Sequence, residues 1–234
     1  MNLKIGSLYI VSIPIGHPKD ITLRALDILS SVDFIICEDI RNASRFLKKS
    51  DLEEKPLLVL NEHNEKDDIS HIVDELLQGK KCALISDCGT PVFADPGHHL
   101  IAQAIDFGIP VKPIPGVSSL MTALSLADRE LHQFYFAGFL PRDKQERQLS
   151  MQQLKRQSVP IILMDTPYRM VAILEDVAKI FSPNQEILLA TDLTQKTEWI
   201  YRGSVKHVLQ ELRKPKAEFI LIVYNKGKPY GKKR

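Results

Sequence analysis

One stretch of the chain, Cys82–Gly97 with the sequence CALISDCGTPVFADPG, combines the residue types that a small-molecule site needs. An apolar strand is expected to end at Asp87, and loop-forming residues follow it. Asp95 and Pro96 then predict the start of a helix, because an aspartate can cap the first turn and a proline needs no amide partner there. Such a strand-loop-helix unit presents backbone amides and a carboxylate at the carboxyl edge of a sheet. The stretch therefore predicts a ligand site in an α/β fold.

Three further loops have a similar design. Ile13–Gly16 follows the first predicted strand, where a proline favours a loop over a helix. Pro115–Ser119 ends a strand and begins a helix, so its hydroxyls and amides can hold a carboxylate or a nucleoside. Met164–Pro167 repeats the cap-and-proline pattern, with Thr166 as the expected cap. Each loop alone is equally explained as an ordinary turn, but together they predict one ligand bound between two domains.

Composition describes a globular protein with reduced cysteines. Of the 234 residues, 44% are hydrophobic. The 31 Lys and Arg residues nearly balance the 29 Asp and Glu residues, so nucleic-acid binding would need a local basic patch. Cys37, Cys82 and Cys88 have no metal-type spacing. The N-terminus has no signal-peptide layout, and no apolar run approaches the ~20 residues of a membrane span. We expect a cytoplasmic protein without membrane association.

Hydrophobic periodicity predicts an α/β protein with two domains. Short β-rich runs alternate with amphipathic helical stretches in the first half, which is typical of a parallel, helix-covered sheet. More strands per helix in the second half, including Phe219–Tyr224, predict a mixed sheet. The pattern changes at Pro113–Val117, a stiff and turn-rich connector. We expect domains at residues 1–114 and 115–225, and a disordered basic tail at residues 226–234.

Several common ligand motifs are missing from the sequence. It has neither the G-x-G-x-x-G pattern of dinucleotide-binding folds nor the P-loop pattern. The glycine-rich motif of common methyltransferases, H-E-x-x-H and Cys/His clusters with zinc spacing are also missing. We therefore expect no metal site.

Other motifs occur in colinear order along nearly the whole chain. They are Ile13–Gly16, Asp20–Leu26, Glu38–Arg41, Glu62–Glu65, Ser86–Pro91, Asp95–Gly97, Pro113–Gly116 and Gly138–Arg142. The combination of SD-x-GTP with a following DPG is the most specific. In this order the motifs resemble the bacterial small-subunit ribosomal RNA cytidine 2′-O-methyltransferases, which belong to the tetrapyrrole-methylase superfamily. The resemblance implies two α/β domains, a homodimer, and S-adenosylmethionine in a cleft between the domains.

The resemblance also implies a set of cofactor-binding residues. Carried over by position, they are Pro14, Asp87, Gly89, Val92, Phe93 and Ala94 in the first domain, and Ser118, Ser119, Asp165, Leu193 and Ala217 in the linker and the second domain. The set suits the ligand, because Asp87 or Asp165 can accept from its cationic amino group while amides hold its carboxylate and an apolar slot holds its adenine. For Val92 and Leu193, core packing is an equal explanation.

Methyl transfer to a ribose hydroxyl mainly requires alignment, and a positioned base helps because the hydroxyl is a poor nucleophile. Glu38 follows the second predicted strand and His63 the third, so we expect both candidate bases at one carboxyl edge. A histidine in such a loop is also explained as a surface residue that caps a helix. Phosphate contacts are expected from Arg41, Arg142 and Arg169, with Lys144 and Arg147 as further candidates in a helix that can equally be a solvated face.

The chain departs from the family pattern more in polar, substrate-facing positions than in the cofactor loops. Ile40 replaces the threonine of E-D-T-R, and His17 replaces the asparagine of T-P-I-G-N. We expect an S-adenosylmethionine-dependent methyltransferase that acts on a ribose 2′-hydroxyl of small-subunit ribosomal RNA, as RNA or as the assembled subunit. The alternatives are a non-catalytic homologue that binds cofactor or RNA, and a methyltransferase with a small-molecule acceptor.

Overall fold

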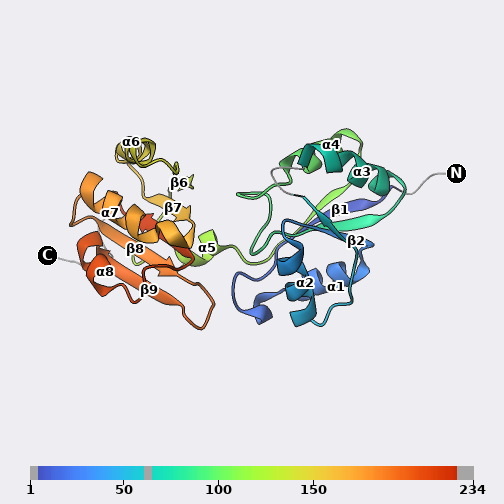
Figure 1. Cartoon of the computed structure of the whole chain (residues 1–234), viewed down its shortest axis with the longest axis horizontal. Helices are drawn as coiled ribbons and strands as arrows, with labels where there is room; N and C mark the ends of the chain where they lie inside the picture. Colours follow the sequence, from blue (N-terminus) through green and yellow to red (C-terminus); the bar gives the residue numbers. More distant parts are fainter. Residues whose placement is uncertain (1–4, 61–64, 226–234) are drawn as a thin grey trace. The chain divides into compact units, whose positions relative to one another are not determined.

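The computed structural model describes residues 5–60 and 65–225 (Figure 1). Contacts within the chain divide it into two compact units, residues 1–118 and 119–234, called here the N-terminal unit and the C-terminal unit. The predicted domain boundary after residue 114 coincides with the end of the last strand of the N-terminal unit. Within the described residues, no helix has the length and apolar character needed to cross a membrane.

The N-terminal unit is built on a parallel sheet, as its alternating sequence pattern predicted. The described residues form a five-stranded sheet in the order β3-β2-β4-β1-β5, and every neighbouring pair is parallel. Its elements are β1 (Ser7–Val11), η1 (Pro18–Asp20), α1 (Leu23–Ser31), β2 (Phe34–Cys37), α2 (Ile40–Lys49), β3 (Leu57–Val59), α3 (Glu65–Leu77), β4 (Lys81–Leu84), α4 (His98–Asp106) and β5 (Val111–Ile114).

Helices cover both faces of this parallel sheet (Figure 1). Alternating strand residues point to opposite faces, so Leu8 packs in a cluster with α3 and α4, whereas Tyr9 packs in a cluster with α1 and α2. Burial on both faces explains why the strands read as continuous apolar runs. Because all strands run in one direction, their carboxyl ends meet at one edge of the sheet.

The C-terminal unit contains a mixed sheet, as predicted. Its described strands have the order β6-β7-β10-β8-β9, with β6 parallel to β7 and the remaining neighbours antiparallel. The elements are α5 (Ser119–Leu124), β6 (Tyr135–Gly138), α6 (Lys144–Leu154), β7 (Ile161–Asp165), η2 (Pro167–Arg169), α7 (Met170–Ile180), β8 (Glu186–Thr191), β9 (Trp199–Ser204), α8 (Val205–Glu211) and β10 (Phe219–Val223). The last strand of the described residues, β10, therefore lies in the middle of this sheet.

One face of the mixed sheet is covered by α6, α7 and α8, which share a buried cluster with residues such as Leu163, Leu189 and Leu221. On the opposite face, α5 contacts β10. The segment after α5 is fastened to the sheet by Arg202, which donates to the Leu126 carbonyl at 2.9 Å, and by Arg129, whose guanidinium lies 3.7 Å from the centre of the Tyr224 ring. The sheet is thus buried on both faces.

Candidate functional site

The loops that follow β1, β4 and β5 are joined by a pair of hydroxyl groups. The Oγ1 atom of Thr90 lies 2.9 Å from Ser12 Oγ and donates to the Val117 carbonyl at 2.9 Å. Gly116 permits this close approach, because a Cβ atom there would lie only 2.9 Å from the Ser12 Cβ. The three strand-end loops therefore hold one another through neutral hydrogen bonds.

A backbone bridge strengthens the same junction. The Ile13 amide donates to the Gly89 carbonyl at 2.9 Å, and the Gly89 amide donates back at 3.1 Å. Gly89 has a φ of +76°, a conformation that glycine adopts without steric cost. The bridge places two predicted cofactor residues, Gly89 and the half-buried Pro14, in neighbouring loops.

Asp87 links this junction to the end of β2. Its Oδ2 accepts a hydrogen bond of 2.7 Å from Asn42 Nδ2 in the first turn of α2. That turn is capped by Asp39, whose Oδ1 accepts from the amides of Arg41 at 2.7 Å and Asn42 at 3.0 Å. Half-buried Glu38 and exposed Arg41 flank the cap, so both lie at the same sheet edge as Asp87. The other candidate base, His63, lies outside the described residues.

The connection from this edge to α4 differs from the sequence prediction. The helix begins at His98 with Gly97 as its N-cap, and no side chain caps it, so the predicted capping role of Asp95 is wrong. Gly97 has a φ of +127°, and a Cβ there would lie 2.7 Å from Leu84 Cδ2. This glycine lets the chain turn closely against β4 before the helix starts, which leaves Asp95 and Pro96 in the loop.

The predicted cofactor segment Val92–Ala94 lies in this irregular loop. Val92 has a φ of +78°, which is a strained conformation for a β-branched residue. The Val92 side chain packs against the cluster around α3 and α4, whereas Phe93 is 66% exposed. Strained backbone of this kind concentrates at ligand sites, because the surrounding structure must hold it in place.

Negative charge gathers at the edge of the parallel sheet. The pKa of Asp95 is raised by burial and then by the charge of Asp87, while a hydrogen bond from Ser86 acts in the opposite direction. The pKa of the Cys37 thiol is raised to about 11, first by burial and then by Asp87 and Asp39. The edge therefore favours a cationic group and disfavours an anionic one.

In the C-terminal unit, Asp165 ends β7 and is almost completely buried. Its Oδ1 accepts from the Thr166 amide at 2.7 Å and lies 3.2 Å from Arg169 Nη1. Its Oδ2 is buried and has no hydrogen-bond partner among the residues that the structure describes. Thr166 precedes a single 3₁₀ turn and makes no side-chain cap bond, so its predicted capping role is wrong. A buried carboxylate oxygen without a donor is suited to a ligand N–H group.

Arg169, predicted to contact phosphate, is engaged within the protein. Besides Asp165, its guanidinium donates to the carbonyls of Leu140 at 3.0 Å and Pro141 at 2.5 Å. It therefore fastens the loop after β6 to the end of β7. Exposed Arg142 lies in that loop, just before α6.

Arg147 does not serve the predicted phosphate role. It is buried, and its Nε donates to Asp176 Oδ2 in α7 at 2.7 Å. Part of the charged face of α6 therefore forms a buried ion pair with α7. The hydrophobic periodicity of the sequence did not indicate this contact.

The loop after β8 is organised around a second buried carboxylate, Asp192. This side chain forms an ion pair with Lys214, accepts from Thr197 Oγ1 at 2.8 Å, and accepts from the Glu218 amide at 3.1 Å. The neighbouring predicted cofactor residues Leu193 and Ala217 are 7% and 5% exposed. Asp192 was not predicted as a site residue, and Asn42, Ser12 and Thr90 were also missed.

Strand register brings the C-terminal residues to one edge. Asp165, Phe219, Thr191 and Trp199 are consecutive register partners across β7, β10, β8 and β9. The predicted residues Ser118 and Ser119 lie at the division between the two units, where α5 begins, and both are half-buried. The described structure therefore places Asp165, Leu193 and Ala217 at the ends of neighbouring strands in the C-terminal unit.

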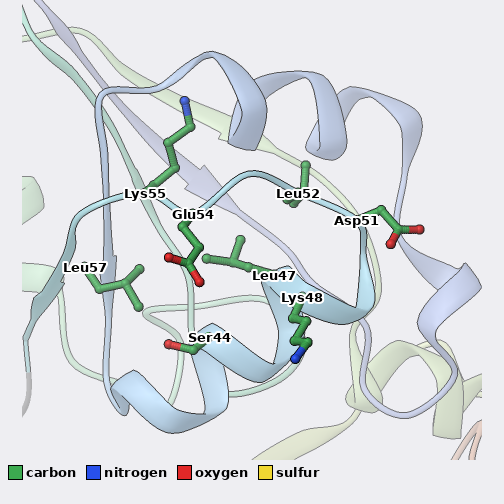
Figure 2. Close-up of a pocket in the computed structure, with 8 residues that line it drawn as sticks. All are labelled: Ser44, Leu47, Lys48, Asp51, Leu52, Glu54, Lys55 and Leu57. Carbon is green, nitrogen blue, oxygen red and sulfur yellow. The ribbon is translucent and has the colours of Figure 1, made fainter.

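A separate hollow of about 530 Å³ lies beside the edge strand β3 (Figure 2). It is lined by Ser44, Leu47, Lys48, Asp51, Leu52, Glu54, Lys55 and Leu57. These residues come from the C-terminal half of α2, the following loop and the start of β3, so the hollow lies toward the amino ends of the strands. None of the predicted site residues lines it. Among the described residues, no group of three His, Cys, Asp or Glu side chains could hold a metal ion.

The fold agrees with a known group of methyltransferases. The structure superposes with a TM-score of 0.66 on a cobalamin biosynthetic enzyme, cobalt precorrin-4 methyltransferase, covering 93% of this chain and 94% of that chain at 17% identity. The family model of the Tetrapyrrole (Corrin/Porphyrin) Methylases matches residues 7–209. The chain belongs to this tetrapyrrole methylase family and is therefore a methyltransferase.

Relatives with similar sequences identify a subgroup within the tetrapyrrole methylase family. Ribosomal RNA small subunit methyltransferase I of Thermotoga maritima is 37% identical over 224 residues, which cover 95% of this chain and 100% of the relative. The protein of the same name from Haemophilus influenzae is 36% identical over 228 residues, which cover 96% of this chain and 80% of the relative. The expected family resemblance is thus confirmed.

Proposed function

We propose that this chain uses S-adenosylmethionine to methylate a ribose 2′-hydroxyl of small-subunit ribosomal RNA in the cytoplasm. The observation that carries the proposal is the similarity, over nearly the full chain, to relatives named as small-subunit ribosomal RNA methyltransferases. The two groups of polar strand-end residues support it, because they supply carboxylates and amides where α/β folds bind ligands.

The residues present fit the cofactor. The buried Oδ2 of Asp165 lacks a donor among the described residues, and the acidic N-terminal edge around Asp87 attracts a cation. We propose that either Asp87 or Asp165 receives the amino group of the cofactor, while amides of the Gly89 loop and hydroxyls near Ser118 and Ser119 hold its carboxylate. When bound, S-adenosylmethionine supplies an electrophilic methyl group on a sulfonium.

The protein's own contribution is alignment and proton removal. Two hydrogen bonds of 2.9 Å fix the loop around Thr90, so a ligand held there is oriented without further ordering of the backbone. Glu38 lies at the same edge and can accept the proton of the ribose hydroxyl, and His63 is the second candidate base. Arg41 and Arg142 are exposed and can contact phosphates of the RNA.

Cofactor binding is tested with Asp87→Ala. We expect calorimetry to show binding by the wild type and a loss of about 1.5–3 kcal/mol in the variant, the range for a hydrogen bond to a charged group. Asp106→Ala is the matched control, because Asp106 is an exposed aspartate at the far end of α4. Unchanged affinity in a folded Asp87→Ala protein would contradict the assignment.

Catalysis is tested by transfer of labelled methyl groups to ribosomal RNA and to small subunits from a strain that lacks this gene. Glu38→Gln and His63→Ala should slow transfer while RNA affinity stays nearly unchanged, since a base acts mainly in the transition state. Wild-type activity in both variants would leave alignment as the mechanism. Absence of transfer despite cofactor binding would favour a non-catalytic homologue or a small-molecule acceptor.

We also propose a homodimer, on the family resemblance. Light scattering at micromolar concentration should give about twice the monomer mass of 26.5 kDa. A monomer mass across that range would reject the proposal.

A further inference from the structure

The C-terminal edge carries exposed aromatic rings paired with cations. Tyr168 is 76% exposed and Trp199 is 40% exposed. The guanidinium of Arg213 lies 3.0 Å from the centre of the Trp199 ring, and Lys216 Nζ lies 4.4 Å from the centre of the Tyr168 ring. These four residues are called the aromatic-basic rim.

The rim lies along one edge of the mixed sheet. Trp199 begins β9 and belongs to the register row that ends at Asp165 in β7. Tyr168 follows that row in the turn after β7, and Arg213 and Lys216 come from the loop that leads into β10. Both ring-cation pairs are therefore anchored to the same line of strand ends.

The loop that carries Arg213 and Lys216 is held to the rest of the unit by internal contacts. The Arg213 amide donates to Tyr201 Oη at 3.0 Å, and Lys214 forms an ion pair with Asp192. Two exposed acids lie nearby: Glu198, which accepts from the Thr194 amide at 2.6 Å, and Glu218, whose pKa is raised by burial and by Asp192. Around the rim, the exposed cations Lys196, Arg213 and Lys216 outnumber the exposed acids Glu198 and Glu218.

We propose that the aromatic-basic rim binds single-stranded RNA, with unpaired bases stacked on Tyr168, Trp199 and the Arg213 plane and with phosphates held by Arg213 and Lys216. Aromatic rings and guanidinium planes stack on every base, and cations attract the backbone. Among the described residues of the segments 166–169, 194–199 and 212–218 that surround the rim, no large aliphatic side chain is exposed, so nucleic acid fits better than an apolar protein surface. The inference rests on the proposed function and specifies how its substrate is held.

The test measures binding of a labelled single-stranded RNA of about 12 nucleotides to the full chain, with its perfect duplex as competitor probe. Trp199→Ala and Tyr168→Ala should each weaken single-strand binding by roughly 5- to 140-fold, the range for loss of one stacked base. Phe134→Ala is the matched control, because Phe134 is also 40% exposed but precedes β6 at the opposite end of the strands. It should bind like the wild type.

Charge is tested separately through salt dependence. Arg213→Gln and Lys216→Gln should each reduce the slope of log K against log salt by about 0.7. Lys206→Gln, an exposed cation in α8, should leave the slope unchanged. Trp199→Phe and Tyr168→Phe should retain most of the single-strand affinity, because they keep a stacking ring.

The outcomes separate the rim from the proposed function. Wild-type transfer to ribosomal RNA together with unchanged RNA affinity in both alanine variants overturns the rim alone. Equal losses on duplex RNA, losses that follow a lowered melting temperature or lost cofactor binding, or losses seen only with whole subunits also overturn it, since they indicate a structural role or a protein partner. A wild type that neither binds nor methylates ribosomal RNA overturns both proposals.

Discussion

The loops after β1, β4 and β5 at the N-terminal edge are joined by neutral hydrogen bonds, whereas the loops at the C-terminal edge are held by ion pairs to the buried carboxylates Asp165 and Asp192. At the N-terminal edge, Thr90 in the loop after β4 is hydrogen-bonded to the loops after β1 and β5. The Ile13–Gly89 backbone bridge also joins the loops after β1 and β4. At the C-terminal edge, Arg169 neutralises Asp165 and Lys214 neutralises Asp192. Both edges present polar groups at strand ends, but they are stabilised by different chemistry.

Strand direction explains the difference. In the parallel sheet the loops after β4, β1 and β5 leave from adjacent strands, so short side chains and backbone groups reach one another. In the mixed sheet β10 runs between β7 and β8 in the opposite direction. The loops after β7 and β8 are therefore two strand spacings apart, roughly 10 Å, and charged side chains hold each loop to its surroundings. A mixed sheet thus makes its edge more dependent on charge.

Removing Arg169 should have the largest effect. Arg169→Ala leaves the buried Asp165 carboxylate without its cation, so we expect the free energy of unfolding to fall by about 3–5 kcal/mol. Urea denaturation of the variant and of Arg169→Ala with Asp165→Asn measures this, and the second change should recover part of the loss. A loss below about 1 kcal/mol, the size of an exposed pair, would remove the contrast between the edges.

The N-terminal edge should instead be sensitive to backbone conformation. Gly97→Ala should lower the free energy of unfolding by about 1–3 kcal/mol, because φ at Gly97 is +127° and the new Cβ would lie 2.7 Å from Leu84 Cδ2. Gly108→Ala is the control: its φ is +69°, but nothing lies within 4 Å of the added Cβ. It should cost less in the same urea titration. Equal costs would show that the contact with Leu84 contributes nothing.

Two threonines allow a direct comparison of neutral and charged bonds. Thr90→Val removes hydrogen bonds between neutral groups and should lower the free energy of unfolding by about 0.5–1.5 kcal/mol. Thr197→Val removes a donor to the charged Asp192 and should lower the free energy of unfolding by more. Thermal and urea unfolding of the two variants rank them. The reverse order would contradict the assignment of charge to the C-terminal edge.

The smallest effect concerns pH. Because the pKa of Asp95 is raised in the folded protein, the folded protein holds the carboxyl proton of Asp95 more tightly than the unfolded chain does. The protonated Asp95 therefore adds to the free energy of unfolding. This contribution is fully present below the ordinary pKa of 3.8 and is lost as the pH rises through the folded pKa. As the pH rises above the ordinary value of 3.8, Asp95→Asn should therefore gain stability relative to the wild type. Adding Asp87→Asn to both proteins should reduce this trend. A difference that is constant with pH would refute it.

Much of the fold could be predicted because its signals are local. Continuous apolar runs and amphipathic stretches predicted the parallel sheet and the mixed sheet, including the strand at Phe219. Loop residues with proline and serine predicted which strand ends carry polar groups. The capping roles of Asp95 and Thr166 failed because Gly97 and a single 3₁₀ turn, respectively, shift the helix starts.

The contacts that define the site could not be predicted, because they join distant residues. Nothing in the local pattern of Asn42 indicates that it donates to Asp87, and Arg147 has the same surroundings in sequence as a solvent-facing arginine. The ring-cation pairs likewise depend on strand register, which brings Trp199 and the loop before Phe219 to one edge. Motif similarity selected candidate residues but not the partners that hold them.

The central position of β10 also has a consequence for the order of synthesis. A ribosome produces β6, β7, β8 and β9 before Phe219–Val223 emerges, yet β7 and β8 pair with β10 and not with each other. The C-terminal sheet therefore stays split into two two-stranded pieces, β6 with β7 and β8 with β9, until β10 emerges. During that interval the facing edges of β7 and β8 are unpaired, and nascent chains are open to strand exchange with one another.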